Sequence, residues 1–212
     1  MVAKNKFLTE ILLLLCSILF MGCPKECINV THSFEGKFYY TPEKKQLVVG
    51  DTLWLASSFS CKSQFNSLTG KYEEFCGAKN LGTTLNMLKL GNDKINDVIE
   101  AVDSFKFVSV KGEIYSAGTE YQNKAVKQVK FEQFDTSYIF RCGIIPQKKG
   151  IYYLGIGNAV NVNRGSSSDC EKASYSFTVG NSTNNIELYY TFKGNTNISD
   201  YEKPRGYWFE VK

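Results

Sequence analysis

Apolar and polar residues alternate along most of the chain beyond residue 33, which is the pattern of β-strands that bury one face. Glycine, proline, asparagine and aspartate residues separate the alternating segments, as expected for turns. The pattern therefore predicts a protein made mainly of short strands. These strands are expected at residues 34–40, 46–49, 52–56, 85–90, 105–113, 126–134, 137–145, 151–156, 173–179, 186–192 and 206–211.

One segment has helical spacing instead. It begins after Asn92 and Asp93, either of which can cap a helix. Apolar residues then recur at intervals of three and four, which places them on one stripe of a helix that packs against a core. The sequence thus predicts one amphipathic helix near residues 93–104. The apolar residues of this stripe are Ile95, Val98, Ile99, Val102 and Phe105.

Many short strands and a single helix predict a mainly β fold, in which two sheets share one core as an antiparallel β-sandwich. Residues 146–150 are expected to join two of the strands in a hairpin-type loop. The segments 140–142 and 150–153, on either side of this loop, resemble the late strands of immunoglobulin-like bacterial domains. This resemblance implies an immunoglobulin-like sandwich and leaves its topology open.

The first residues of the chain have the composition of an export signal. Lys4 and Lys6 precede a stretch without charged residues that runs from residue 11 to residue 24. This stretch is shorter than the ~20 apolar residues of a membrane-spanning helix, and it suits the apolar region of a signal peptide. Within it, Gly22 and Cys23 follow the apolar run.

This segment resembles the precursor of a bacterial lipoprotein. The resemblance implies that signal peptidase II cuts after Gly22, that Cys23 carries the acyl chains, and that the protein is anchored at the bacterial cell envelope. Ordinary secretion, with cleavage by the general signal peptidase, is the alternative. The chain then divides into a signal peptide (1–22), an N-terminal tether (23–33) and a single β-sandwich domain (34–212).

Composition and charge fit a single folded domain and limit the classes of partner that it could bind. Hydrophobic residues make up 43% of the chain and charged residues 22%, which excludes a disordered protein. The ~190 residues after the signal are enough for one core. The formal net charge of +4 is too small to indicate nucleic-acid binding. The expected partners are therefore the membrane, through the lipid, and a protein or a glycan.

Seven cysteines bear on the redox chemistry of the chain. Cys16 leaves with the signal, and the resemblance to lipoproteins assigns Cys23 to the lipid. Cysteines outside the cytoplasm pair where geometry permits, and five cysteines cannot all pair within one chain. The five that are left are Cys27, Cys61, Cys76, Cys142 and Cys170.

Two disulfides are expected among these five. Cys61 and Cys76 flank a long polar stretch that a disulfide would close. Cys142 lies in an apolar strand, and we expect it to pair with Cys170. Cys27 would then be left unpaired near the anchor, although spacing alone does not fix the connectivity. Metal binding is disfavoured because the chain has no C-x₂-C pair and only one histidine, His32.

Few residues of the chain indicate catalysis. His32 is the only histidine, and we expect it to be exposed in the tether, so a catalytic triad has no support. Glu113, Glu120 and Glu132 could serve a glycosidase, which needs two carboxylates, but nothing in the sequence selects a pair. We therefore expect no catalytic residues, no metal and no cofactor.

Aromatic residues occur as neighbours along several predicted strands. One of each pair is expected in the core and the other outside, because neighbouring side chains of a strand point to opposite faces. Outward aromatic residues on adjacent strands would form a platform for a sugar or a partner protein. The pairs are Tyr39-Tyr40, Tyr152-Tyr153, Tyr189-Tyr190 and Tyr207-Trp208-Phe209.

The expected function is that of a non-catalytic envelope lipoprotein that acts as a binding or structural module. Two alternatives stay open. A carbohydrate-binding module would use the outward aromatic residues, and a hydrolase would use carboxylates that the sequence does not identify.

Overall fold

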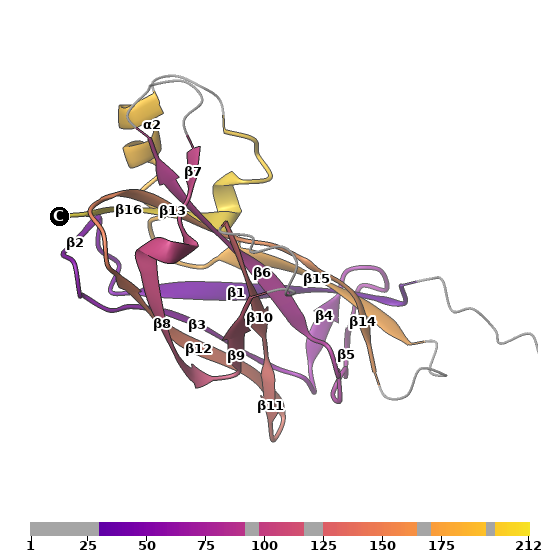
Figure 1. Cartoon of the computed structure of the whole chain (residues 1–212). Helices are drawn as coiled ribbons and strands as arrows, with labels where there is room; N and C mark the ends of the chain where they lie inside the picture. Colours follow the sequence, from indigo (N-terminus) through magenta and orange to yellow (C-terminus); the bar gives the residue numbers. More distant parts are fainter. Residues whose placement is uncertain (1–29, 92–97, 117–124, 165–170, 194–197) are drawn as a thin grey trace, which may run out of the picture.

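The computed structural model describes residues 30–91, 98–116, 125–164, 171–193 and 198–212. Within them, the strands form two seven-stranded sheets and a separate two-stranded hairpin. Figure 1 shows the strands crossing the whole molecule, with the helix α2 (Glu187–Lys193) at its margin. The prediction of a mainly β protein is therefore confirmed.

The two large sheets are named sheet I and sheet II. Sheet I has the order β11 (Glu132–Phe134), β12 (Ser137–Pro146), β3 (Leu53–Ser60), β1 (His32–Thr41), β15 (Lys172–Val179) and β14 (Ala159–Asn163), and β8 (Phe105–Lys111) also pairs with β12. Sheet II has the order β2 (Gln46–Leu47), β16 (Gly206–Val211), β13 (Gly150–Ile156), β6 (Gly82–Leu90), β10 (Val126–Lys130) and β9 (Glu113–Tyr115), and β7 (Val98–Glu100) also pairs with β6. The hairpin consists of β4 (Gln64–Asn66) and β5 (Lys71–Glu73), and the helical elements are η1 (Val102–Ser104), α2 (Glu187–Lys193) and η2 (Lys203–Arg205).

Both large sheets are mixed, so the prediction of an antiparallel arrangement is not confirmed. β1 runs parallel to β15, with His32 opposite Ala173, and β16 runs parallel to β2. Residues 146–150 connect β12 of sheet I to β13 of sheet II, and they therefore cross between the sheets instead of closing a hairpin. The direction of a strand and the sheet it belongs to depend on pairing partners that are distant in sequence. The local alternation of apolar and polar residues carries no information about those partners.

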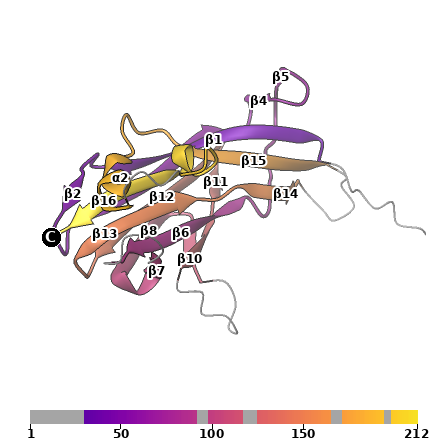
Figure 2. The same ribbon diagram turned by 90° about the horizontal axis from the view of Figure 1, so that it is seen from above.

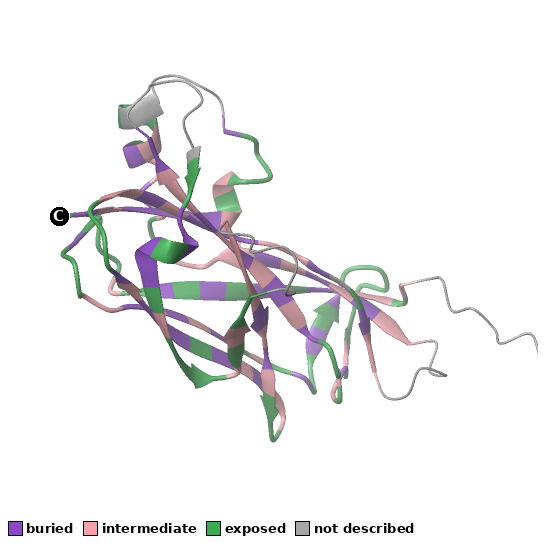
Figure 3. Cartoon of the chain, viewed as in Figure 1, coloured by how far each residue is buried: buried purple, intermediate pink, exposed green. Residues whose placement is uncertain are grey.

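The two large sheets bury one shared core. Residues alternate between buried and exposed along β1, as the striped strand in Figure 3 shows. Phe38 and Tyr40 are fully buried, whereas Tyr39 between them is 45% exposed. Tyr40 stacks on Tyr207 of sheet II with 4.5 Å between the ring centroids. Aromatic contacts of this kind hold the inner faces of the sheets together.

The helix expected near residues 93–104 is wrong over the part that the structure describes. Residues 98–100 form β7 against β6, and η1 follows at residues 102–104, whereas residues 92–97 lie outside the described part. Of the predicted apolar stripe, Val102 and Phe105 are buried, but Ile99 of β7 is 48% exposed. The extended backbone that pairs with β6 therefore does not bury the whole stripe.

The strand expected at residues 186–192 is also wrong, because α2 occupies most of it. Asn184 lies just before this helix, and its Oδ1 accepts a hydrogen bond from the backbone N–H of Ile186 at 3.3 Å. Asparagine satisfies free N–H groups at a helix start in this way. The tyrosines of this segment favour strands by propensity, but packing of the helix on sheet II overrides that preference.

Candidate functional site

Residues of β6 in sheet II line three cavities, the first of which also extends to Ala159 of β14 in sheet I. Residues of this strand alternate between the core and the outer face, and Thr84, Asn86 and Leu90 line the first, second and third cavity in turn. Leu88 lines both the second and the third. Their volumes are about 410, 420 and 180 Å³. We call them together the β6 trough, with a polar end, a middle and an aromatic end.

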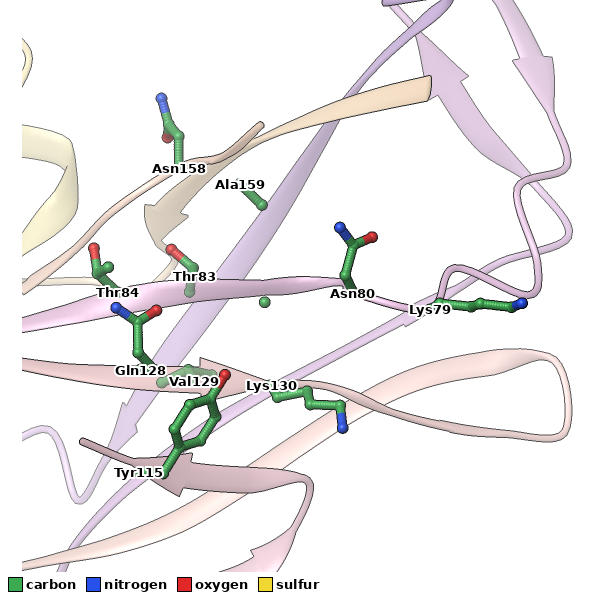
Figure 4. A pocket seen from close by; sticks show the side chains of 11 residues that line it. Lys79, Asn80, Thr83, Thr84, Tyr115, Gln128, Val129, Lys130, Asn158 and Ala159 are labelled. Carbon is green, nitrogen blue, oxygen red and sulfur yellow. The ribbon is translucent and has the colours of Figure 1, made fainter. Parts of the chain in front are cut away.

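The polar end of the β6 trough is shown in Figure 4. Tyr115 of β9 and Gln128 of β10 are opposite each other in the paired strands and lie side by side in this view. Tyr115 is 46% exposed. The Gln128 amide and the Thr84 hydroxyl have no hydrogen-bond partner among the described residues. An aromatic ring and free polar groups therefore line this cavity together.

Charge at the polar end is positive. Lys79 and Lys130 are the charged side chains that line this cavity. Lys130 Nζ lies 3.4 Å from Oε1 of Glu113, so part of its charge is balanced. Lys79 has no carboxylate within ion-pair distance among the described residues. The polar end therefore favours a ligand that is neutral or anionic there.

Arg205 forms one wall of the middle of the β6 trough. Its Nε donates to Oδ1 of Asn158 at 3.3 Å, and its Nη2 donates to Oγ of Ser176 at 3.1 Å. The guanidinium also lies 3.8 Å from the centroid of the Tyr201 ring, which is a cation–π contact. Asn158 lines the polar end, so its bond to Arg205 marks the boundary between the first two cavities.

The aromatic end is built on a cross-strand pair. Tyr153 of β13 is directly opposite Trp208 of β16, and their ring centroids are 5.0 Å apart. Tyr189 of α2 packs on Trp208 at 6.4 Å. Leu188 and Ile198 complete a small apolar cluster that leaves Trp208 only 1% exposed. The helix α2 thus covers part of the aromatic face and forms one wall of the pocket through Tyr189.

Two glycines let these rings lie close to the sheet. Gly155 and Gly206 are opposite each other on β13 and β16. A Cβ atom on Gly155 would lie 2.4 Å from Oη of Tyr153, and one on Gly206 would lie 2.3 Å from Cε2 of the same ring. Any side chain at either position would push Tyr153 away from the sheet.

The Tyr153 hydroxyl is a hydrogen-bonding group and not an acid–base group at physiological pH. Burial raises the pKa of Tyr153 to about 12, and the Glu202 carboxylate adds to this increase. Within the described residues, no group of three or more histidine, cysteine, aspartate or glutamate side chains is placed to hold a metal. The β6 trough can therefore act by ring stacking, hydrogen bonding and charge.

The prediction about aromatic neighbours holds for the strands. Tyr40 and Tyr152 are buried, while Tyr39 and Tyr153 lie on the outer faces. Trp208 also faces outward, but α2 covers it. The pair expected near residue 189 lies on α2 instead of a strand. Two outward aromatic residues on adjacent strands do come together, and they line a pocket instead of an open platform.

One of the two expected disulfides is present. Cys61 and Cys76 are bonded, with 4.8 Å between their Cα atoms. The expected pair of Cys142 and Cys170 is wrong, because Cys142 is a free thiol buried in the core. Cys142 faces inward on β12, where its neighbours are apolar core side chains. Cys170 lies outside the described residues, as do Cys23 and Cys27.

His32 is part of the folded domain and not of an exposed tether. Its side chain is 12% exposed, and Nε2 lies 3.2 Å from Oε2 of Glu73. Its ring packs between Phe34 and Phe75. Hydrogen bonds from the side chains of Thr69 and Asn66 lower the pKa of Glu73, and His32 contributes a smaller effect. β1 begins at residue 32, two residues before the expected start of the domain at residue 34.

The carboxylates considered for a hydrolase do not form a cleft. Glu113 pairs with Lys130, and Glu132 pairs with Lys111 at 3.2 Å. Neither lines the β6 trough. Glu120 lies outside the described residues.

A search of protein-family models, curated protein sequences and solved structures finds no match to this chain. In the part of the chain that the structure describes, no helix is long and apolar enough to span a membrane.

Proposed function

We propose that this protein is a non-catalytic binding module, held at the bacterial cell envelope by acyl chains on Cys23, and that it binds an oligosaccharide in the β6 trough. The observation that carries the proposal is that residues of one strand, β6, line three cavities, the second and third of which share Leu88, Tyr153 and Glu202. A succession of cavities suits an extended ligand with repeating units better than a single compact molecule.

The chemistry of the lining supports a sugar. Sugars present an apolar ring face beside several hydroxyl groups, and proteins bind them with aromatic rings next to hydrogen-bonding side chains. The β6 trough offers such a pair at the polar end, where Tyr115 lies beside Gln128, and another in the middle, where Tyr153 and Arg205 line the same cavity. The two lysines at the polar end favour a sugar unit that carries an acidic group.

The finer description of the fold is also a proposal. We infer that sheets I and II form a β-sandwich related in layout to immunoglobulin-like domains, with mixed strand directions. The shared core and the crossing of residues 146–150 between sheets support this description.

The binding proposal is tested with an array of neutral and acidic oligosaccharides. We expect the wild-type protein to bind at least one of them and Tyr115→Ala to weaken that binding. Tyr39→Ala is the matched control, because Tyr39 is 45% exposed and Tyr115 is 46% exposed, but Tyr39 lies on sheet I. Equal binding by both variants would place the ligand elsewhere. Cleavage of a bound sugar by the wild-type protein would contradict the non-catalytic assignment.

The lipid is tested separately by metabolic labelling with a fatty-acid analogue. We expect the wild-type protein to be labelled and Cys23→Ala to be unlabelled. Labelling that survives the substitution would contradict the assignment of Cys23, and an unlabelled wild-type protein would support ordinary secretion.

A further inference from the structure

The β4–β5 hairpin exposes apolar side chains that its own fold does not need. Phe65 is 51% exposed, Leu68 is 61% exposed and Tyr72 is 73% exposed. Phe65 and Tyr72 are opposite each other in the hairpin, with 5.6 Å between their ring centroids. Phe65 and Tyr72 therefore form an exposed aromatic pair, and together with Leu68 in the turn between β4 and β5 they are named the hairpin patch.

The hairpin patch is held rigidly. The Cys61–Cys76 disulfide closes the base of the hairpin. Asn66 is fully buried, and its Oδ1 accepts hydrogen bonds from the backbone N–H groups of Ser33 and Leu68, both at 3.0 Å. Its Nδ2 donates to Oε2 of Glu73 at 2.8 Å. The exposed rings are therefore displayed in a fixed position, and their exposure is not the result of a loose loop.

The hairpin lies where the chain enters the domain. The backbone N–H of Ser67 donates to the carbonyl of Ser33 at 2.9 Å, and His32 pairs with Glu73. Cys23 is eight residues before Thr31. Eight residues span at most ~28 Å when fully extended. A lipid on Cys23 therefore keeps the start of β1, and the hairpin beside it, close to the membrane surface.

We propose that the hairpin patch inserts into the interfacial region of the phospholipid bilayer that carries the lipid anchor. The inference rests on the proposed acylation of Cys23. Aromatic rings are favoured at the interface between lipid and water, where one side is apolar and the other is wet. Of the carboxylates near the patch, Glu74 pairs with Lys62 at 2.9 Å and Glu73 lies 3.2 Å from Nε2 of His32. Glu35, which lines a cavity together with Phe65, has no ion-pair partner among the described residues.

This contact would orient the domain. Figures 1 and 2 both place the β4–β5 hairpin and α2 toward opposite ends of the molecule. With the hairpin at the bilayer, the aromatic end of the β6 trough faces away from the membrane. The lipid then fixes the distance of the domain from the membrane, and the hairpin fixes its orientation.

The test uses the acylated full-length protein in vesicles of phosphatidylethanolamine and phosphatidylglycerol, with and without brominated acyl chains that quench tryptophan. Phe65→Trp places a reporter in the hairpin patch. Val48→Trp is the control, because Val48 is 54% exposed and lies beside β2, near the end of the molecule that carries the C-terminus.

We expect brominated lipid to remove most of the emission that Phe65→Trp adds and to leave that of Val48→Trp unchanged. Adding Leu68→Ser and Tyr72→Ser to Phe65→Trp should abolish the quenching. Equal emission of Phe65→Trp in both vesicles, for protein that is acylated and bound, would overturn the orientation and leave the anchor intact. Protein that carries no acyl chain would overturn the anchor and this inference together, and fatty-acid labelling distinguishes the two results.

Discussion

Tyr153 and Trp208 face each other across β13 and β16 with 5.0 Å between their ring centroids, and both rings lie over the glycine pair formed by Gly155 and Gly206. The glycines provide the space, the two rings form the apolar wall, and α2 covers Trp208. The shape of the aromatic end thus depends on residues from three separate segments of the chain.

Gly206→Ala tests this dependence. The new Cβ would lie 2.3 Å from Cε2 of Tyr153 and 2.5 Å from Cη2 of Trp208, so both rings must move. We expect a loss of about 1–3 kcal/mol in the free energy of unfolding, as for overpacking in a core, and a shift in tryptophan emission. Gly77→Ala is the control, since it strains a backbone with φ of +81° but meets no atom within 4 Å. An unchanged emission spectrum in Gly206→Ala would contradict the packing described.

Gln64→Leu is expected to stabilise the protein. Gln64 is 7% exposed, and neither polar atom of its amide has a hydrogen-bond partner in the described part of the chain. Burial raises the pKa of the Tyr175 hydroxyl, and the nearby Gln64 amide lowers it by a smaller amount. Within the described residues, however, neither the Tyr175 hydroxyl nor the Gln64 amide makes a hydrogen bond of normal geometry. An unsatisfied buried polar group costs about 1–3 kcal/mol, so its removal should raise the melting temperature.

Asn66→Leu provides the matched control for Gln64→Leu. Asn66 lies on the same face of β4, but its amide is fully hydrogen-bonded, so its loss should lower the melting temperature. A similar loss of stability in both variants would mean that Gln64 has partners in solution.

Cys142 is expected to resist alkylation in the folded protein. Burial raises the pKa of this thiol to about 11, so the reactive thiolate is scarce at neutral and mildly alkaline pH, and the surrounding core blocks the reagent. Iodoacetamide at pH 8 should modify Cys142 only after denaturant is added, as peptide mass mapping would show. Rapid modification of the native protein would contradict its burial.

A second disulfide is expected between Cys27 and Cys170. Both lie outside the described residues, but the strands that follow them, β1 and β15, run parallel as neighbours, and the backbone N–H of Thr31 donates to the carbonyl of Lys172 at 2.8 Å. Outside the cytoplasm, two such thiols would oxidise together. A peptide map of the non-reduced protein should contain this bridge, and a free thiol at Cys170 would contradict it.

The strands of the fold could be predicted from the sequence where one face is buried. The alternation of β1 is explicit because Phe34, Phe38 and Tyr40 enter the core from one side. Residues 98–104 could not be assigned in this way, because their extended form depends on pairing with β6. Local sequence patterns could not predict the strand directions either, because the parallel pair of β1 and β15 joins segments that are far apart in the chain.

The candidate site was predicted only in part. Outward aromatic neighbours were expected, and Tyr153 is one of them, but Arg205 and Glu202 were missed because they belong to a segment without a motif. The sequence did not indicate that a glycine is needed at position 155, because that need arises from the close approach of the Tyr153 ring in the folded protein. The hairpin patch lies in the long polar stretch between Cys61 and Cys76, where the sequence predicted no strand.

The central claim is that the β6 trough holds an oligosaccharide, and the most direct measurement is titration of the intrinsic tryptophan emission with the oligosaccharide that binds best on the array. Trp208 lines the aromatic end, so a sugar bound there should change the emission in a saturable way. We predict that Tyr115→Ala weakens this response about tenfold, which corresponds to ~1.4 kcal/mol, while Tyr39→Ala leaves it unchanged. An array without any bound sugar, or a response that both variants retain in full, would contradict the account.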